Sequence, residues 1–140
     1  MAENYKILAR FIKDISAETS NFETYMFVKN RISKYNLHID ITSLAVKDRI
    51  IEINTKLSLV DPNESEKKTY FEIVYATVVR IDETIKNSKE IEKIVLCDAQ
   101  NKIYPDLEKI FLKLIVDSGY PEPKPNKKID FEELFKNKNS

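Results

Sequence analysis

Apolar and polar residues alternate along two neighbouring segments of the chain, residues 36–46 and 50–60. Alternation with a period of two is typical of a β-strand that buries one of its faces. A short turn at residues 46–49 joins the two segments, so we expect them to pair as antiparallel strands. The apolar face comprises Leu37, Ile39, Ile41, Ile51, Ile53, Leu57 and Leu59.

A third long strand is predicted at residues 68–81, which are rich in β-branched and aromatic residues. From Ile73 onward this segment is apolar on both faces, which indicates that both faces are covered. A turn at residues 61–65 connects it to the hairpin, so the three strands are expected to form an antiparallel meander. Residues 5–15 predict a further strand, also apolar on both faces, at the start of the chain.

Residues 16–35 interrupt this pattern and are predicted to form a long crossover loop between the first strand and the meander. The loop nevertheless carries the aromatic residues Phe22, Tyr25 and Phe27. Two interpretations are open. These side chains fill a small core beneath the loop, or they line an exposed groove that binds apolar peptide segments without sequence preference.

In the last third of the chain the hydrophobic period becomes helical. Residues 91–97 suit a short helix. Tyr104-Pro105 is predicted to open a longer helix, because the first helical turn tolerates proline. Gly119 is placed to end that helix.

A connector with prolines at alternate positions, residues 121–125, leads to a last short helix. Asp130 is placed to cap that helix, whose apolar residues are Phe131, Leu134 and Phe135. The whole order predicts an α+β fold. The predicted elements are a strand, a long loop, three antiparallel strands, a long helix and a short C-terminal helix.

Length and charge limit the classes of function. The 140 residues suggest a single domain, residues 1–140. Lys+Arg and Asp+Glu are equal at 23 each, so there is no general attraction to nucleic acid or to an anionic membrane. No apolar run approaches the roughly 18 residues that span a bilayer. With charges through the N-terminal segment and a single cysteine, the sequence predicts a cytoplasmic protein without membrane insertion.

Catalytic chemistry has little support in the sequence. The single glycine, Gly119, excludes glycine-rich phosphate loops. His38 is the only histidine and is interpreted as an ordinary surface or edge residue, since base catalysis usually needs an orienting partner. Cys97 lies on an apolar helical face and is interpreted as a buried structural thiol. No residues have zinc-ligand spacing. We therefore expect no enzyme activity, no metal and no cofactor.

Two segments resemble the SecB family of protein-export chaperones. Residues 12–18, Ile-Lys-Asp-Ile-Ser-Ala-Glu, are similar to the family pattern Y-x-K-D-I-S-x-E at the end of its first strand. Residues 104–135 resemble the aromatic-Pro helix start, the Gly-aromatic-Pro connector and the final helix of the family. The resemblance spans roughly residues 5–136 and implies a four-stranded antiparallel sheet backed by a long helix.

The resemblance implies a function as well as a fold. SecB proteins assemble as dimers of dimers, hold extended non-native precursors in apolar grooves and hand them to the export motor SecA. We therefore expect a homo-oligomer, most simply a tetramer, that binds unfolded polypeptides. The client-binding residues are expected to be Phe22, Tyr25, Phe27, Phe131, Leu134 and Phe135.

The same resemblance implies a SecA contact on the exposed face of the sheet. By position it comprises Asp14, Glu18, Tyr70 and Glu72. Lys13 precedes Asp14 and is expected to point to the opposite face, because side chains alternate along a strand. The local sequence supplies no obvious cation for all three carboxylates.

Two alternative functions stay open. A SecB-like chaperone dedicated to another system, such as a toxin–antitoxin pair, has the same sequence features. A small antiparallel sheet packed on one helix also suits a ligand-binding or oligomerisation module that is not a chaperone. A single closed pocket favours the module, whereas a continuous surface groove that crosses a subunit boundary favours the chaperone.

Overall fold

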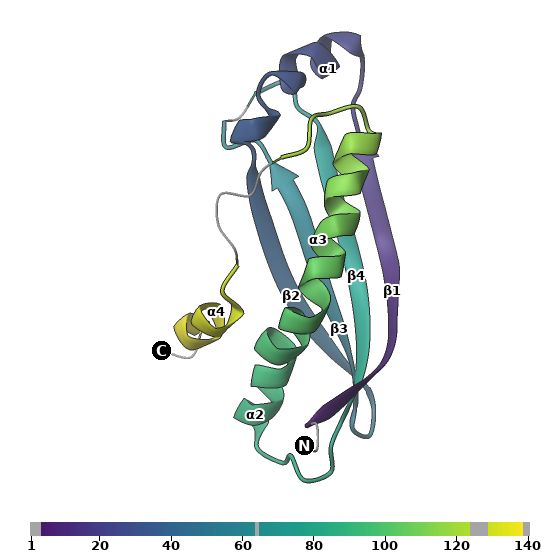
Figure 1. Cartoon of the computed structure of the whole chain (residues 1–140), viewed down its shortest axis with the longest axis vertical. Coiled ribbons are helices and arrows are strands. Elements are labelled where there is room, and N and C mark those ends of the chain that lie inside the picture. The colour runs from purple at the N-terminus through teal and green to yellow at the C-terminus, as the bar shows by residue number, and fades with distance from the viewer. Residues whose placement is uncertain (1–3, 64, 124–128, 139–140) are drawn as a thin grey trace.

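A four-stranded antiparallel sheet forms the body of the protein, and a long helix runs across one of its faces (Figure 1). A computed structural model describes residues 4–63, 65–123 and 129–138. The strands are β1 (Tyr5–Glu18), β2 (Asn36–Lys47), β3 (Ile50–Val60) and β4 (Tyr70–Ile81), in the spatial order β1-β4-β3-β2. The predicted α+β class and its antiparallel meander are confirmed. We call the sheet face that points away from the long helix the open face.

The turn between β2 and β3 is made without glycine. Arg49 takes up the left-handed backbone conformation, with φ of 64°. Its guanidinium donates hydrogen bonds to the backbone carbonyl of Ile81, the last residue of β4, and to those of Asp82 and Ile85 in the following loop. These bonds offset the cost of the left-handed conformation and tie the hairpin tip to the following loop.

β1 is longer than the predicted strand and contains two β-bulges, one between Ile7 and Ala9 and one between Ile12 and Asp14. A bulge places two residues opposite one and so breaks the alternation of faces. Lys13 consequently reaches Glu52 on the open face, with Nζ 2.7 Å from a carboxylate oxygen. The expectation that Lys13 points away from the face of Asp14 was therefore wrong.

The crossover between β1 and β2 is helical rather than an irregular loop, which corrects the prediction. Helix α1 (Phe22–Lys29) and a 3-10 turn, η1 (Ile32–Lys34), occupy most of it. The side chain of Asn21 caps α1 by accepting a 2.9 Å hydrogen bond from the N–H of Thr24. Val28 and Ile32 are buried in the main core and anchor the segment at one end of the sheet.

One long helical segment follows β4. It comprises α2 (Ser88–Lys93), a π turn η2 (Ile94–Asp98) and α3 (Ala99–Asp117). The predicted start at Tyr104-Pro105 was wrong, because Pro105 lies inside α3. The predicted end is confirmed: Ser118 closes the helix and Gly119 follows with φ of 103°, a conformation that favours glycine.

Helix α4 (Phe131–Lys138) confirms the predicted C-terminal helix. Asp130 caps it, accepting a 3.1 Å hydrogen bond from the N–H of Glu133. Phe131 is buried and meets the ring of Tyr104 edge-on, with ring centroids 5.4 Å apart. Part of the connector before α4, residues 124–128, lies outside the described residues.

The main core lies between the sheet and α3. Phe71 and Ile73 of β4 share one buried cluster with Leu107, Phe111 and Ile115 of α3. Burying each such side chain contributes about 1.5–3 kcal/mol. Cys97 belongs to the same cluster, so its predicted burial is confirmed. This packing fixes α3 diagonally across the sheet and leaves the side of β2 partly uncovered (Figure 1).

Candidate functional site

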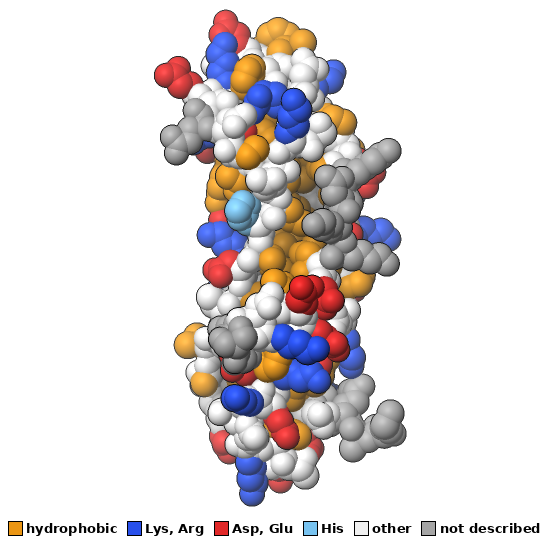
Figure 2. Space-filling view, turned by 90° about the vertical axis from the view of Figure 1, so that its left-hand side faces the viewer, with side chains coloured by type: hydrophobic (Ala, Val, Ile, Leu, Met, Phe, Trp, Pro, Cys, Tyr) orange, Lys and Arg blue, Asp and Glu red, His pale blue; other side chains and the backbone are white. Residues whose placement is uncertain are grey.

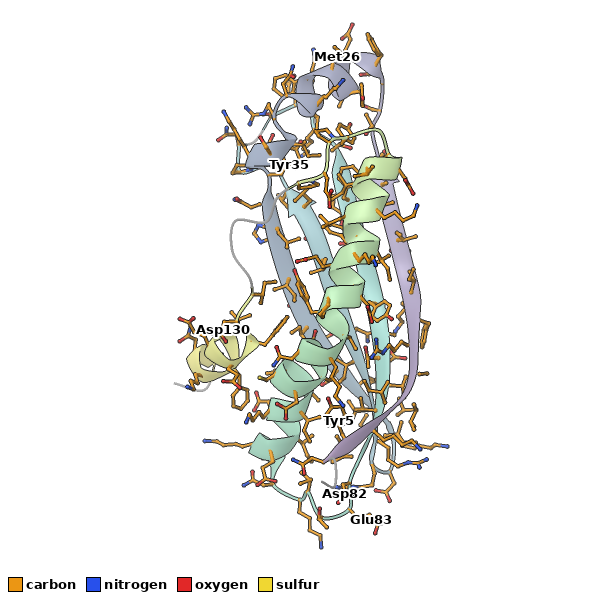
Figure 3. All side chains as sticks on the ribbon, viewed as in Figure 1. Tyr5, Met26, Tyr35, Asp82, Glu83 and Asp130 are labelled. Carbon is orange, nitrogen blue, oxygen red and sulfur yellow. The ribbon has the colours of Figure 1, made fainter. Side chains whose placement is uncertain are left out.

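An apolar groove lies between β2, α3 and α4, with a cavity volume of about 750 Å³. Tyr35 just before β2 and Asp130 just before α4 both line it, and both are labelled in Figure 3. Figure 2 looks onto the β2 side, where apolar side chains form a band beside the single histidine. The apolar lining residues are Leu37, Ile39, Leu57, Leu59, Phe111, Leu112, Ile115, Pro123, Ile129 and Leu134.

The groove exists because β2 is the last strand of the sheet. Leu37 and Ile39 point towards the helix side, as their alternation predicted, but α3 lies mainly over β3 and β4. These two residues therefore stay half-buried, whereas Leu57 on β3 is fully buried. An apolar side chain left half-covered at a sheet edge provides a surface for another apolar chain.

Polar groups are placed at the rim and floor of the groove. His38, Glu108 and Glu133 line it from β2, α3 and α4. The Tyr104 side chain is buried, and its hydroxyl has no hydrogen-bond partner of satisfactory geometry among the described residues. Burial, followed by the nearby carboxylate of Glu108, raises the pKa of the Tyr104 phenol. The hydroxyl therefore stays protonated at neutral pH.

The three candidate client-binding residues of α4 have different positions. Leu134 lines the groove and is 46% exposed. Phe131 is buried against Tyr104, and Phe135 packs against the main core. Only Leu134 of this set can touch a molecule in the groove without rearrangement, because the two phenylalanines hold α4 in place.

The three candidate residues of α1 lie at the end of the sheet, outside the groove lining. Phe22 is 73% exposed. Phe27 is partly exposed beneath the guanidinium of Arg31, 5.3 Å from its ring centre. Tyr25 packs on Tyr120 and donates a 2.7 Å hydrogen bond to the Gly119 carbonyl. The structure therefore separates the α1 aromatics from Leu134.

Most of the groove residues could not be recognised as such from the sequence pattern. Leu37 and Ile39 were assigned only to a buried strand face, and Leu112 received no role. One available signal was the position of their strand: β2 comes first in the meander, so it was a possible sheet edge with an incompletely covered face.

The second candidate surface lies on the open face, where the four predicted SecA-contact residues come together. Glu18 is paired with Tyr70, and Ser16 with Glu72, across β1 and β4. Asp14 is opposite Val74, the next open-face position along β4. A shallow depression beside them is lined by Lys13, Asp14, Asp40, Thr42, Asn54, Lys56 and Val74.

One carboxylate of this surface has a cation that the local sequence did not reveal. Lys56 on β3 places Nζ 2.9 Å from a carboxylate oxygen of Glu72. The Tyr70 hydroxyl also donates to this carboxylate. That hydrogen bond, together with Lys56, lowers the pKa of Glu72, and it is the main cause that raises the pKa of Tyr70 to about 12.

Together the sheet, the helix and the edge groove define a sheet-and-helix fold with an open surface groove rather than a closed pocket. The chain matches the family described as "Preprotein translocase subunit SecB" over residues 1–140, and it belongs to the SecB family. It is 59% identical to a relative from Pelagibacter ubique (strain HTCC1062) that carries the SecB name, over 97% of both chains. It is 24% identical to the protein-export protein SecB of Rhodopseudomonas palustris (strain BisB18), over 96% of this chain and 80% of that protein.

Among solved structures, the fold is similar to a SecB-like chaperone of Mycobacterium tuberculosis, Rv1957, in complex with a ChAD peptide from the HigA1 antitoxin. The TM-score is 0.62 at 11% identity, covering 89% of this chain and 91% of that one. Family and fold together support a chaperone role in protein export. In the described part of the chain, no helix is both long and apolar enough to cross a membrane.

Proposed function

We propose that this protein is a cytoplasmic chaperone that holds unfolded or precursor polypeptides in the groove between β2, α3 and α4 for SecA-dependent export. The observation that carries the proposal is the groove itself, a surface channel of about 750 Å³ with apolar walls on a protein of the SecB family. Contact with apolar surface yields about 25 cal/mol per Å² removed from water and needs no fixed client sequence.

The α1 aromatics extend the proposed client surface. Phe22 and Phe27 remain exposed although they lie on a regular helix, which leaves apolar area at the end of the molecule. Phe131 and Phe135 support the groove by fixing α4, and Leu134 contacts the client. A client long enough to reach both surfaces gains affinity from two linked contacts.

Photo-crosslinking tests the proposed site directly. A photoreactive amino acid at Leu37, in the groove, is expected to crosslink to guanidine-denatured citrate synthase. The same group at Leu44, which is 60% exposed on the open face, serves as the matched control. Equal crosslinking from the two positions removes the groove from the proposal. A folded variant with Phe22, Tyr25 and Phe27 changed to Ala that holds the client like the parent removes α1.

The proposed SecA contact is the open-face set Asp14, Glu18, Tyr70 and Glu72. Two strands bring these side chains together, and a surface with unpaired carboxylates suits a basic segment of a partner. The groove opens on the other side of the sheet, so a client and the motor can bind at the same time. A homotetramer is part of the same proposal.

A chaperone dedicated to a toxin–antitoxin pair is the second candidate. It is favoured by the fold similarity to a SecB-like chaperone bound to an antitoxin peptide. Holding of several unrelated denatured proteins supports the export role, whereas holding of a single dedicated client supports the second candidate.

A further inference from the structure

We infer that the groove recognises client polypeptide as an added β-strand, paired through backbone hydrogen bonds to the free edge of β2. The inference rests on the proposed function and specifies the form in which a client binds. Its starting point is that β2 occupies the end of the sheet order β1-β4-β3-β2. Within the described residues, β2 pairs with β3 alone. Alternate residues of an edge strand present unpaired N–H and C=O groups outward.

The edge of β2 and the groove coincide. The lining includes the consecutive residues Tyr35, Asn36, Leu37, His38 and Ile39. Side chains alternate between the two faces of a strand, so consecutive residues line one space only when the strand edge itself faces it. The backbone of β2 is therefore one wall of the groove.

This part of the edge lacks the usual protection against strand addition. Natural sheets guard edge strands with charged side chains, lysine above all, and with proline or bulges. Residues 36–41 read Asn-Leu-His-Ile-Asp-Ile, so they contain neither lysine nor proline and have one charged residue, Asp40. The one irregularity of the β2–β3 pairing lies between Ala45 and Lys47, at the far end of the strand.

The length of the groove matches one short extended segment of polypeptide. Residues 35–39, which run from Tyr35 just before β2 to Ile39, extend over about 16 Å at roughly 3.3 Å per residue. The α3 wall from Tyr104 to Ile115 covers about 17 Å at 1.5 Å per residue. Ile129 and Leu134 line the groove from the side of α4. This space admits an extended segment of about five residues.

Side-chain chemistry defines the segment that fits. Alternate residues of an added strand point towards Leu37, Ile39 and Leu112, so they must be apolar. The intervening residues point to the open face and are free to be polar. The preferred client segment therefore alternates apolar and polar residues and lacks proline.

Backbone methylation of a peptide tests this inference. The probe is a fluorescein-labelled decapeptide of alternating leucine and serine with a lysine at each end. Two copies carry N-methyl groups, one on the leucines and one on the serines. We expect at least one copy to bind ten or more times more weakly, because each methyl set removes the hydrogen-bond donors of one edge. We also expect the decapeptide to slow amide exchange at alternate residues of 36–39.

Each other outcome is decisive. If both methylated copies bind as tightly as the parent peptide, strand addition is refuted, while the proposed holding function stands. If denatured citrate synthase is held but the decapeptide does not bind, strand addition is also refuted. Alternate amides of residues 36–39 point away from β3. Slow exchange of these outward-pointing amides before peptide is added shows that the edge is already covered, which again refutes it. If neither the decapeptide nor the denatured protein binds, both the inference and the proposed function are wrong.

Discussion

On the open face of the sheet, Nζ of Lys56 lies 2.9 Å from a carboxylate oxygen of Glu72. Glu72 is therefore largely compensated within the protein. The carboxylates of Asp14 and Glu18 form no ion pair with another described residue. The three acids of the proposed SecA contact therefore differ in how much negative charge is left unpaired. Asp14 and Glu18 on β1 offer most of that charge to a partner.

Charge changes on this face test the motor contact. We expect Asp14→Lys to weaken SecA binding at least tenfold and Glu72→Gln to weaken it less than threefold, since Lys56 already pairs with Glu72. Binding of the parent should weaken steeply as salt rises. Titration of labelled SecA measures both effects. A parent that does not bind SecA, or an Asp14→Lys variant that binds equally well, contradicts the export assignment.

The hydrogen bond between Tyr70 and Glu72 has its own titration signature. The Glu72 carboxylate, followed by partial burial, raises the pKa of Tyr70 to about 12. In the Glu72→Gln variant this pKa should fall towards the ordinary value of about 10, because a neutral amide no longer disfavours the phenolate. The phenolate absorbance of the parent minus that of a Tyr70→Phe variant isolates this residue. If the pKa of Tyr70 is unchanged in the Glu72→Gln variant, the hydrogen bond to Glu72 is not the cause of the shift.

Arg31 and Asp61 fasten the crossover to the turn after β3, with guanidinium nitrogen and carboxylate oxygen 3.0 Å apart. Burial alone would raise the pKa of Asp61, but hydrogen bonds from the Asn63 N–H and from Arg31 lower it overall. Asp61→Asn should lower the free energy of unfolding by about 1–3 kcal/mol at neutral pH.

The pH dependence of that loss has a defined sign. A lowered folded pKa stabilises the protein fully above the unfolded value of about 3.9. The difference between parent and Asp61→Asn should therefore shrink as the pH falls through the folded pKa of Asp61. Urea unfolding at several pH values measures it. A difference that stays constant down to the lowest pH shows that the charge of Asp61 is not the cause.

β1 exposes apolar side chains on both of its faces, which predicts an oligomer interface. Leu8, Phe11, Ile12 and Ile15 are between 39% and 45% exposed. We expect the parent to be a tetramer in light scattering and an Ile12→Glu, Ile15→Glu variant to dissociate to smaller species. Leu44→Glu, a similar change outside β1, should leave the size unchanged. A monomeric parent at micromolar concentration refutes the interface.

Regular alternation made β2 and β3 predictable from the sequence almost to the residue, since one face of each is polar. Three features could not be read in this way. The bulge before Asp14 leaves no mark in a strand that is apolar on both faces. The π turn η2 joins α2 to α3 without a break. Pro105 therefore lies inside α3, although it was expected to mark the start of a helix. Asn21 was a readable helix cap, but the aromatic residues after it lack a strong apolar stripe.

The two candidate sites also differ in how far the sequence predicts them. The sequence motif around Asp14 and Glu18 placed both residues on one strand. The pairing of that strand with β4 then determines that Tyr70 and Glu72 lie beside them. The groove was not predictable in this way. It depends on where α3 crosses the sheet and on how Phe131 seats α4, and both are properties of packing between distant segments.

Suppression of aggregation by two matched leucine variants tests the central claim most directly. Leu134→Glu places a charge in the groove, whereas Leu44→Glu places one at a similarly exposed site outside it. Light scattering of guanidine-denatured citrate synthase, diluted into buffer with each folded variant, is the measurement. We expect Leu44→Glu to suppress aggregation like the parent and Leu134→Glu to require several times more protein for the same effect. Equal suppression by both variants, or none by the parent, contradicts the account.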